Sequence, residues 1–186
     1  SNIANSMQVS LVGAQRVFEV LDAPAEITSP PNPVRLPDPQ GDVIFDQVGF
    51  AYEDGEPVLR DISFHAKPNQ CVAVLGATGA GKTTLLSLIP RFYDPTAGRV
   101  LIDGHDARAL ELDDLRKACG MVFQESFLFS NTVAANIAFG HPEATREQIV
   151  NAARVAAAHE FIEGLDHGYD TIIGENGVGL SGGQRQ

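Results

Sequence analysis

The sequence is poor in cysteine, in positive charge and in long apolar runs. Its 186 residues include two cysteines, Cys71 and Cys119, which are too few for the disulfide framework of a small secreted domain. Lys and Arg number 13 against 24 Asp and Glu, a formal net charge of −11. This balance argues against a general nucleic-acid-binding protein, because such proteins need a basic face. No run reaches the roughly 18 apolar residues of a membrane-spanning helix, so we expect none within the chain.

The rest of the composition is that of a globular protein, with 44% hydrophobic and 20% charged residues. A chain of this length can form one substantial core, or one domain with a small attachment. Cys71 falls in a predicted buried strand, so we expect a reducing, cytosol-facing environment. The chain begins at Ser1 without an initiator Met and shows no secretory signal peptide, so we expect it to be part of a longer protein.

One glycine-rich stretch, residues 76–84, fits the pattern G-x-x-x-x-G-K-[ST] of the phosphate-binding P-loop, or Walker A motif. The apolar run 71–75 before it predicts a short buried strand, and residues 85–89 predict the start of a helix that Pro90 stops. Glycines let such a loop turn tightly and point its N–H groups at phosphate oxygens. A glycine-rich turn that binds nothing is the alternative, and the flanking strand and helix argue against it.

The motif assigns a role to each of its residues. Lys82 is expected to reach the β- and γ-phosphates of ATP, and Thr83 to place its hydroxyl on Mg²⁺. The nucleotide-binding residues predicted here are Gly76, Ala77, Thr78, Gly79, Ala80, Gly81, Lys82, Thr83 and Thr84.

The first 41 residues are predicted to be a helix followed by a linker. Apolar residues in steps of three and four predict an amphipathic helix over residues 1–23. They are Ile3, Met7, Leu11, Ala14, Phe18 and Leu21. Two interpretations remain open on this pattern alone: a helix packed on its own domain, or the cytosolic end of a helix that continues into a membrane. Residues 24–41 hold six of the eleven prolines, so they predict an extended linker and a domain boundary.

Residues 42–125 alternate short apolar runs with turns. Strands are predicted at 43–45, 48–52, 62–66 (half-exposed, in an antiparallel sheet), 99–102 and 121–123, with a hairpin turn at 103–104 and a helix at 112–117. Tyr52 could stack on an adenine ring, but an ordinary strand tyrosine is the simpler local interpretation. Gln124 follows the last strand, where the carboxyl end of a parallel strand would face a nucleotide crevice.

Residues 126–186 are predicted to be mainly helical. A short helix is expected over residues 131–137. Thr145 and Gln148 fit a capping box that opens a helix running to about His159. The residues expected to face inward from this helix are Ile149, Ala152, Ala153 and Ala156. A glycine-rich loop over residues 164–179 follows.

The run Leu180-Ser181-Gly182-Gly183-Gln184 is a second candidate phosphate cradle. Ser181 offers a hydroxyl, Gly182 and Gly183 offer N–H groups, and a helix is expected to begin near Gln184. One nucleotide rarely needs two cradles, whereas two subunits packed head to tail would use both. A flexible Gly/Ser tail is the alternative.

These motifs, in this order over residues 42–186, resemble the nucleotide-binding domain of an ABC transporter. The resemblance implies an α/β fold: a P-loop NTPase (RecA-like) core, an N-terminal antiparallel β subdomain and a helical subdomain. It implies that Tyr52 stacks on adenine, which reverses the local interpretation. It implies that Gln124 contacts Mg²⁺ and the attacking water, as a catalytic and metal-binding residue. The signature residues implied to bind the γ-phosphate held by a partner domain are Ser181, Gly182, Gly183 and Gln184.

The exporter branch of that family is the most similar. Residues 174–179 resemble the exporter X-loop, with Glu175 at its acidic position, although Asn176 stands where the pattern usually has arginine. Residues 13–22 resemble the stretch that leaves the last transmembrane helix of fused exporters, which favours residues 1–23 as a cytosolic extension of that helix. The implied partners are a transmembrane domain, a second nucleotide-binding domain and ATP, without nucleic acid, at the cytoplasmic face of the plasma (bacterial inner) membrane.

The family's Walker B aspartate, catalytic glutamate and switch histidine have no counterpart up to Gln186, so the core is expected to be truncated. Residues 42–125 would be the ATP-binding core with the β subdomain, and residues 126–186 the helical subdomain. We expect the parent protein to be an ATPase and leave this chain's own turnover open. The alternatives are a soluble ABC-type ATPase of translation or DNA repair, and a nucleotide-binding dimerisation module without turnover.

Overall fold

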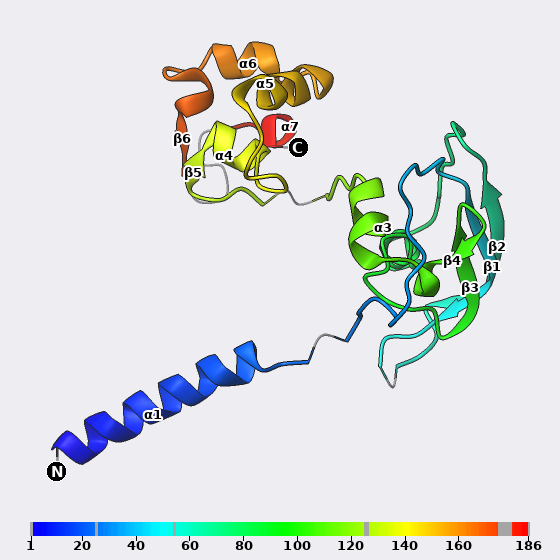
Figure 1. Ribbon diagram of the computed structural model, residues 1–186, viewed down its shortest axis with the longest axis horizontal. Coiled ribbons are helices and arrows are strands. Elements are labelled where there is room, and N and C mark those ends of the chain that lie inside the picture. Colours follow the sequence, from blue (N-terminus) through cyan, green and yellow to red (C-terminus); the bar gives the residue numbers. More distant parts are fainter. Residues whose placement is uncertain (1, 25, 54, 125–126, 175–179, 186) are drawn as a thin grey trace. The chain divides into compact units, whose positions relative to one another are not determined.

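The computed structural model describes residues 2–24, 26–53, 55–124, 127–174 and 180–185. These fall into two compact units, residues 1–120 and residues 121–186, which are described separately (Figure 1). The first unit contains α1 (Asn2–Leu21), β1 (Val43–Phe50), β2 (Leu59–Ala66), α2 (Lys82–Ser87), β3 (Ala97–Ile102), β4 (His105–Asp106), η1 (Ala107–Ala109) and α3 (Leu112–Ala118). The second contains β5 (Asn131–Thr132), α4 (Val133–Ile137), α5 (Arg146–Val155), α6 (His159–Glu163), η2 (Gly168–Asp170), β6 (Ile172–Ile173) and α7 (Gly182–Arg185).

An antiparallel sheet in the order β2-β1-β3-β4 forms one side of the first unit. Phe45 of β1 lies opposite Phe64 of β2 and Val100 of β3, and its ring stacks on Phe64 with centroids 4.6 Å apart. Phe45 and Val100 are each 1% exposed, because one face of the sheet is packed and the other meets solvent. The predicted half-exposed antiparallel strand at 62–66 is therefore confirmed as part of β2.

The turn between β3 and β4 follows directly from its sequence. Asp103 and Gly104 have φ of 50° and 80°, the left-handed values that two-residue hairpins with a type I′ turn require. Beyond the turn, Asp106 accepts hydrogen bonds from the backbone N–H and the guanidinium of Arg108. These bonds lower the pKa of the Asp106 carboxyl below its usual value. The predicted hairpin is thus confirmed.

Helices α2 and α3 cover the packed face of the sheet (Figure 1). Leu88, Leu110 and Leu115 are at most 1% exposed and join Phe45 in one apolar cluster. Burying side chains of this size contributes about 1.5–3 kcal/mol each relative to leaving them exposed. The cluster therefore fixes where α2 begins, and with it the end of the glycine-rich loop.

The proline-rich segment packs against the first unit rather than hanging free of it. Val34 donates its N–H to the carbonyl of Ala109 at 2.8 Å, and its own carbonyl accepts from Glu111 N–H at 2.9 Å. Leu36 is 9% exposed and belongs to the main apolar cluster. Prolines cannot donate, so the residues between them make these bonds. The segment is extended, as predicted, but hydrogen bonds at Val34 and the burial of Leu36 attach it to the first unit.

Two predicted strands are absent from the part of the chain that the structure describes. Residues 71–75 and 121–123 belong to no sheet, and residues 71–75 are exposed. A strand needs a neighbour to take up its backbone donors and acceptors, and neither segment has a ladder partner. The prediction of a buried strand before the loop is therefore wrong.

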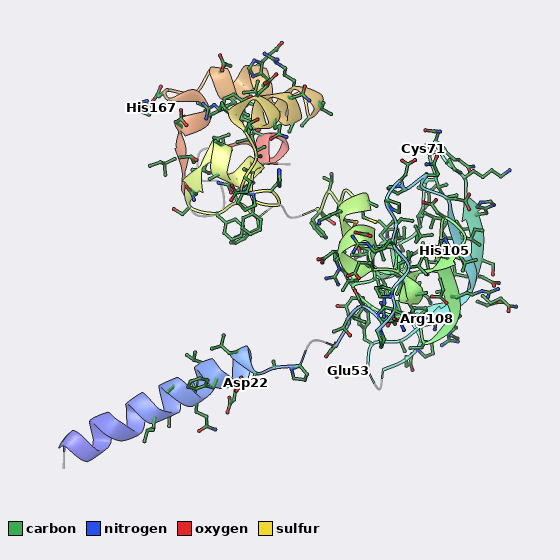
Figure 2. The ribbon with its side chains drawn as sticks, in the orientation of Figure 1. Asp22, Glu53, Cys71, His105, Arg108 and His167 are labelled. Atoms are coloured by element: carbon green, nitrogen blue, oxygen red, sulfur yellow. The ribbon has the colours of Figure 1, made fainter. Side chains whose placement is uncertain are left out.

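The two cysteines lie in different environments, and that of Cys71 differs from the expected one. Cys71 is exposed at the periphery of the first unit (Figure 2), so its predicted burial is wrong. The inference of a reducing environment loses the support that this burial gave it. Cys119, after α3, is half-buried, and burial raises the pKa of its thiol.

The second unit is mainly helical, as predicted. Thr145 accepts from Gln148 N–H at 3.3 Å, and the Gln148 side chain accepts from Thr145 N–H at 2.8 Å, so the predicted capping box is confirmed. Helix α5 ends at Val155, short of the predicted end near His159, because Ala157 adopts φ 55°. A separate helix, α6, begins at His159.

The inward face of α5 is narrower than predicted. Ile149 and Ala153 are buried, whereas Ala152 and Ala156 are exposed. Ala152 lies about 100° around the helix from Ala153, and Ala156 lies beyond the last helical residue. Helix α4 begins at Val133, two residues later than predicted, because Asn131 and Thr132 pair with β6.

The predicted N-terminal helix is present as α1. Of its described apolar side chains, Leu11, Phe18 and Leu21 are 60–70% exposed. Among the residues that the structure describes, no helix is long and apolar enough to cross a membrane.

Candidate nucleotide-binding site

The glycine-rich loop ends in a backbone conformation that suits glycine alone. Gly79 and Gly81 have φ of 83° and 84°, and Gly81 is the residue that caps α2. A Cβ at position 81 would lie 2.9 Å from Leu59 Cδ2, whereas open space surrounds position 79. The motif glycines therefore let the chain turn into α2, and Gly81 also lets the loop lie close to β2.

Lys82 is half-buried at the first position of α2, and its ammonium group folds over the loop. The Nζ atom donates to the carbonyl of Gly76 at 2.9 Å and to that of Ala77 at 2.7 Å. An ammonium carries three donors, so two are used on the loop itself. This places one positive charge over the backbone amides that the motif predicts will meet phosphate.

The two threonines after Lys82 lie in different surroundings. Thr83 is exposed. Thr84 is 6% exposed, and its Oγ1 lies 2.9 Å from the Tyr52 hydroxyl. The structure thus brings Tyr52 to the helix that carries Lys82, although 32 residues separate Tyr52 from Thr84.

Tyr52 stands in a cluster of three aromatic rings. Its ring lies edge to face with Phe50, centroids 4.8 Å apart, and with Tyr93, centroids 5.2 Å apart. The Tyr52 side chain is 43% exposed and lines a pocket of about 580 Å³ together with Tyr93 and Phe92. An aromatic surface of this kind can accept a flat heterocycle by stacking.

Sequence reasoning missed the companions of Tyr52. Phe50 shares the period-two spacing of a strand with Tyr52, which is a signal that they lie on one face. Tyr93 and Thr84 carry no such signal, because their approach depends on how α2 packs against the sheet.

The signature segment forms a compact start to a helix. Ser181 Oγ accepts from Gln184 N–H at 3.3 Å, and Gln184 Oε1 accepts from Ser181 N–H at 2.9 Å. Helix α7 begins at Gly182, slightly before the predicted start, and the Cβ positions of Gly182 and Gly183 meet nothing within 4 Å. Approach to this backbone is therefore open. Residues 175–179, which carry the predicted X-loop positions Glu175 and Asn176, lie outside the described residues.

Gln124 is an exposed residue of the second unit. Its role beside Mg²⁺ and water stays a prediction. No group of three or more His, Cys, Asp or Glu side chains that could hold a metal ion occurs within the described ranges. The metal ligands predicted from the sequence are instead the Thr83 hydroxyl and the Gln124 amide. These fit Mg²⁺, which takes one or two protein oxygens and completes its shell with phosphate and water.

Comparison with known proteins gives a consistent result. The family model described as "ABC transporter" matches residues 59–186. Over all 186 residues, the chain is 47% identical to an ATP-dependent lipid A-core flippase of Syntrophus aciditrophicus. The match covers 31% of the length of that protein. Over 182 residues, the chain is 46% identical to a fatty acid ABC transporter ATP-binding/permease protein of Mycobacterium bovis. That match covers 98% of this chain and 28% of the relative.

A solved structure shares the fold. A bacterial Atm1-family ABC exporter with ATP bound superposes with a TM-score of 0.85 at 39% identity, covering 98% of this chain and 32% of that one. The chain thus spans about a third of the length of the relatives that it matches. The fold class expected from the sequence is confirmed, and by its family match the chain belongs to the ABC transporter family.

Proposed function

We propose that this chain is the ATP-binding part of an ABC-type exporter, whose parent protein couples ATP binding and hydrolysis to transmembrane transport. The observation that carries the proposal is the P-loop. Gly79 and Gly81 adopt the left-handed conformation that suits glycine, and Lys82 holds its ammonium over the loop backbone. The relatives that the chain matches are named as a flippase and an ATP-binding/permease protein, which supports the transport assignment.

Each part of ATP has a proposed partner on this chain. The amides of residues 76–81 and the Lys82 ammonium bind the β- and γ-phosphates, which is favourable because charge-assisted hydrogen bonds are the strong ones. Tyr52 stacks on adenine. Mg²⁺, held by the Thr83 hydroxyl and Gln124, neutralises phosphate charge when bound.

The signature segment is proposed to serve a different nucleotide from the one that its own P-loop binds. Ser181, Gly182, Gly183 and Gln184 present amides and a hydroxyl to the γ-phosphate held by a second nucleotide-binding domain, packed head to tail. Open space at both glycines supports this, because a phosphate can approach the backbone. The site then needs two domains to be complete.

The wider organisation is part of the same proposal. Residues 1–23 extend the last transmembrane helix, residues 24–41 connect it, residues 42–125 form the ATP-binding core with the β subdomain, and residues 126–186 form the helical subdomain. The parent lies in the plasma (bacterial inner) membrane with this chain on the cytoplasmic face. Hydrolysis is assigned to the full-length parent protein.

Phosphate release from Mg-ATP by the full-length protein, reconstituted in phospholipid vesicles, tests the proposal. Activity should follow the membrane fraction and disappear in Lys82→Ala. Lys67→Ala removes an equal charge at an exposed position and should keep full activity. A full-length protein found only in the soluble fraction, or activity that survives Lys82→Ala, would contradict the proposal.

A further inference from the structure

Two hydroxyl groups meet between the proposed adenine platform and the phosphate-binding helix. The Tyr52 hydroxyl lies 2.9 Å from Thr84 Oγ1, and Thr84 is 6% exposed. The Walker A pattern ends at Thr83. Thr84, the next residue, is also predicted to bind nucleotide, yet its side chain is buried against Tyr52. Thr83, one residue before it, is exposed instead. The Thr84 hydroxyl therefore lies against the Tyr52 hydroxyl.

The Tyr52 ring is also held by its aromatic neighbours. Phe50 and Tyr93 each meet it at an interplanar angle of 89°, the edge-to-face arrangement that aromatic quadrupoles favour. The position of Tyr93 is itself defined. Two residues before it, Arg91 is 7% exposed, and its guanidinium donates bidentate hydrogen bonds of 2.7 and 3.1 Å to the Asp94 carboxylate.

Arg91 also donates to the carbonyl of Thr28 at 3.2 Å, so the turn that carries Tyr93 is bonded on both sides. Tyr52, by contrast, lies two residues beyond the end of β1 and has no ladder bonds of its own in the sheet. A ring at the end of a strand needs outside contacts to keep one orientation. Thr84 supplies a polar contact at the Tyr52 hydroxyl, and Tyr93 supplies an aromatic contact at the Tyr52 ring.

We propose that Thr84 and Tyr93 are positioning residues, which hold the Tyr52 ring in one orientation for a purine base. The inference rests on the proposed function, because it takes Tyr52 as the surface on which adenine stacks. Holding the ring before the base arrives lowers the entropy lost on binding, so affinity for the base portion rises. On this proposal neither side chain contacts phosphate, which separates base recognition from phosphate recognition.

Calorimetric titration of the full-length protein with two ligands tests the inference. Mg-ATP carries the base, and Mg-tripolyphosphate has the phosphates without it. Tyr52→Phe keeps the ring and removes the hydroxyl, and Thr84→Val keeps the shape of Thr84. Each should weaken Mg-ATP binding by about 3- to 10-fold, the range for one hydrogen bond. The double variant should be no weaker than the worse single variant, and Mg-tripolyphosphate affinity should stay within about twofold in all three.

Tyr93 is tested by a matched pair. Tyr93→Leu should weaken Mg-ATP binding by about 2- to 10-fold, the range for one aromatic pair, whereas Tyr93→Phe should restore it. Unchanged Mg-tripolyphosphate binding in Tyr93→Leu shows that the variant is folded.

The outcomes separate the two levels of inference. Equal loss of both ligands in Thr84→Val would make Thr84 a phosphate ligand and overturn its positioning role. Unchanged Mg-ATP affinity in Tyr93→Leu would overturn the role of Tyr93. Wild-type protein that bound neither ligand would contradict the proposed function itself.

Discussion

At the scale of single residues, glycine is required at positions 79 and 81 of the loop for different reasons. Gly79 and Gly81 share a left-handed backbone with φ near 83°. Position 79 is surrounded by open space, so only its conformation calls for glycine. At position 81 a Cβ would also lie 2.9 Å from Leu59, which is 5% exposed. Conformation and crowding therefore both exclude a side chain at Gly81.

The two alanine variants should separate these effects. Gly79→Ala should lower the free energy of unfolding by about 1–2 kcal/mol, the cost of left-handed backbone for an L-residue. Gly81→Ala should cost about 1–3 kcal/mol more, because the added methyl group displaces the buried Leu59. Urea unfolding followed by circular dichroism measures the difference. Equal stabilities of the two variants would contradict the crowding at position 81.

At the scale of elements, the proline-rich segment supplies the cap that α3 lacks. Glu111 occupies the N-cap position of α3 without a capping bond from its own side chain. Ser29 Oγ takes over, accepting from Leu112 N–H at 2.9 Å and donating to Glu111 Oε1 at 2.8 Å. Arg35 adds an ion pair to Asp114 at 2.8 Å. The segment and the helix are therefore bonded to each other.

Ser29→Ala should weaken this attachment by about 1 kcal/mol, the usual value of an N-cap. Hydrogen exchange should then speed up about fivefold at the Val34 amide, which bonds to the Ala109 carbonyl at 2.8 Å. Thr28→Ala is the control, because Thr28 bonds through its backbone carbonyl and its side chain is exposed. The capping role would be wrong if both variants exchanged like the wild type.

Elements set by local sequence could be predicted, and those set by distant partners could not. The capping box at Thr145 and the hairpin at Asp103-Gly104 depend on residues within four positions, and both are confirmed. The run 71–75 has a strand's composition but no ladder partner, so its apolar pattern did not decide its structure. Tertiary pairing overrides β propensity in such runs.

The candidate site shows the same division. The glycine-rich loop is visible in the sequence because its motif is contiguous, and its left-handed glycines at 79 and 81 agree with the predicted turn. The contacts of Tyr52 with Thr84 and Tyr93 join three separate segments, so no local pattern marks them. The contacts of residues 27–36 with the rest of the first unit could not be predicted either. Prolines dominate the composition of this segment, whereas the residues between them make the contacts.

At the scale of the whole molecule, the proposed function gives the chain two half-sites for nucleotide. One is the P-loop, and the other is the signature segment. The net charge of −11 disfavours anion binding in general, so phosphate binding has to come from local backbone amides and Lys82. The P-loop belongs to the first unit and the signature segment to the second. Pairing of two domains head to tail would give each nucleotide one surface of each kind.

That pairing predicts an effect of charge at the signature glycines. Gly182→Asp places a carboxylate where the partner's γ-phosphate is proposed to lie, so Mg-ATP-dependent association of two domains should weaken at least about 10-fold. Mg-ATP binding to the variant's own P-loop should stay within about twofold. Gly140→Asp makes the same charge change at a position with nothing within 4 Å and should behave like the wild type.

Analytical ultracentrifugation of the full-length protein in detergent, with and without Mg-ATP, measures this association. Unchanged association in Gly182→Asp would contradict the proposed use of the signature segment. The P-loop assignment would then still stand on its own evidence.

The most direct test of the central claim is the affinity of the full-length protein for Mg-ATP in Lys82→Ala, measured by calorimetry beside Lys67→Ala. Loss of the charge-assisted bonds from Lys82 to phosphate should weaken binding by about 10- to 150-fold, corresponding to about 1.5–3 kcal/mol. Lys67→Ala, at an exposed position away from the loop, should bind like the wild type. Equal affinity of Lys82→Ala and wild type would contradict the assignment of residues 76–84 as an ATP-binding loop.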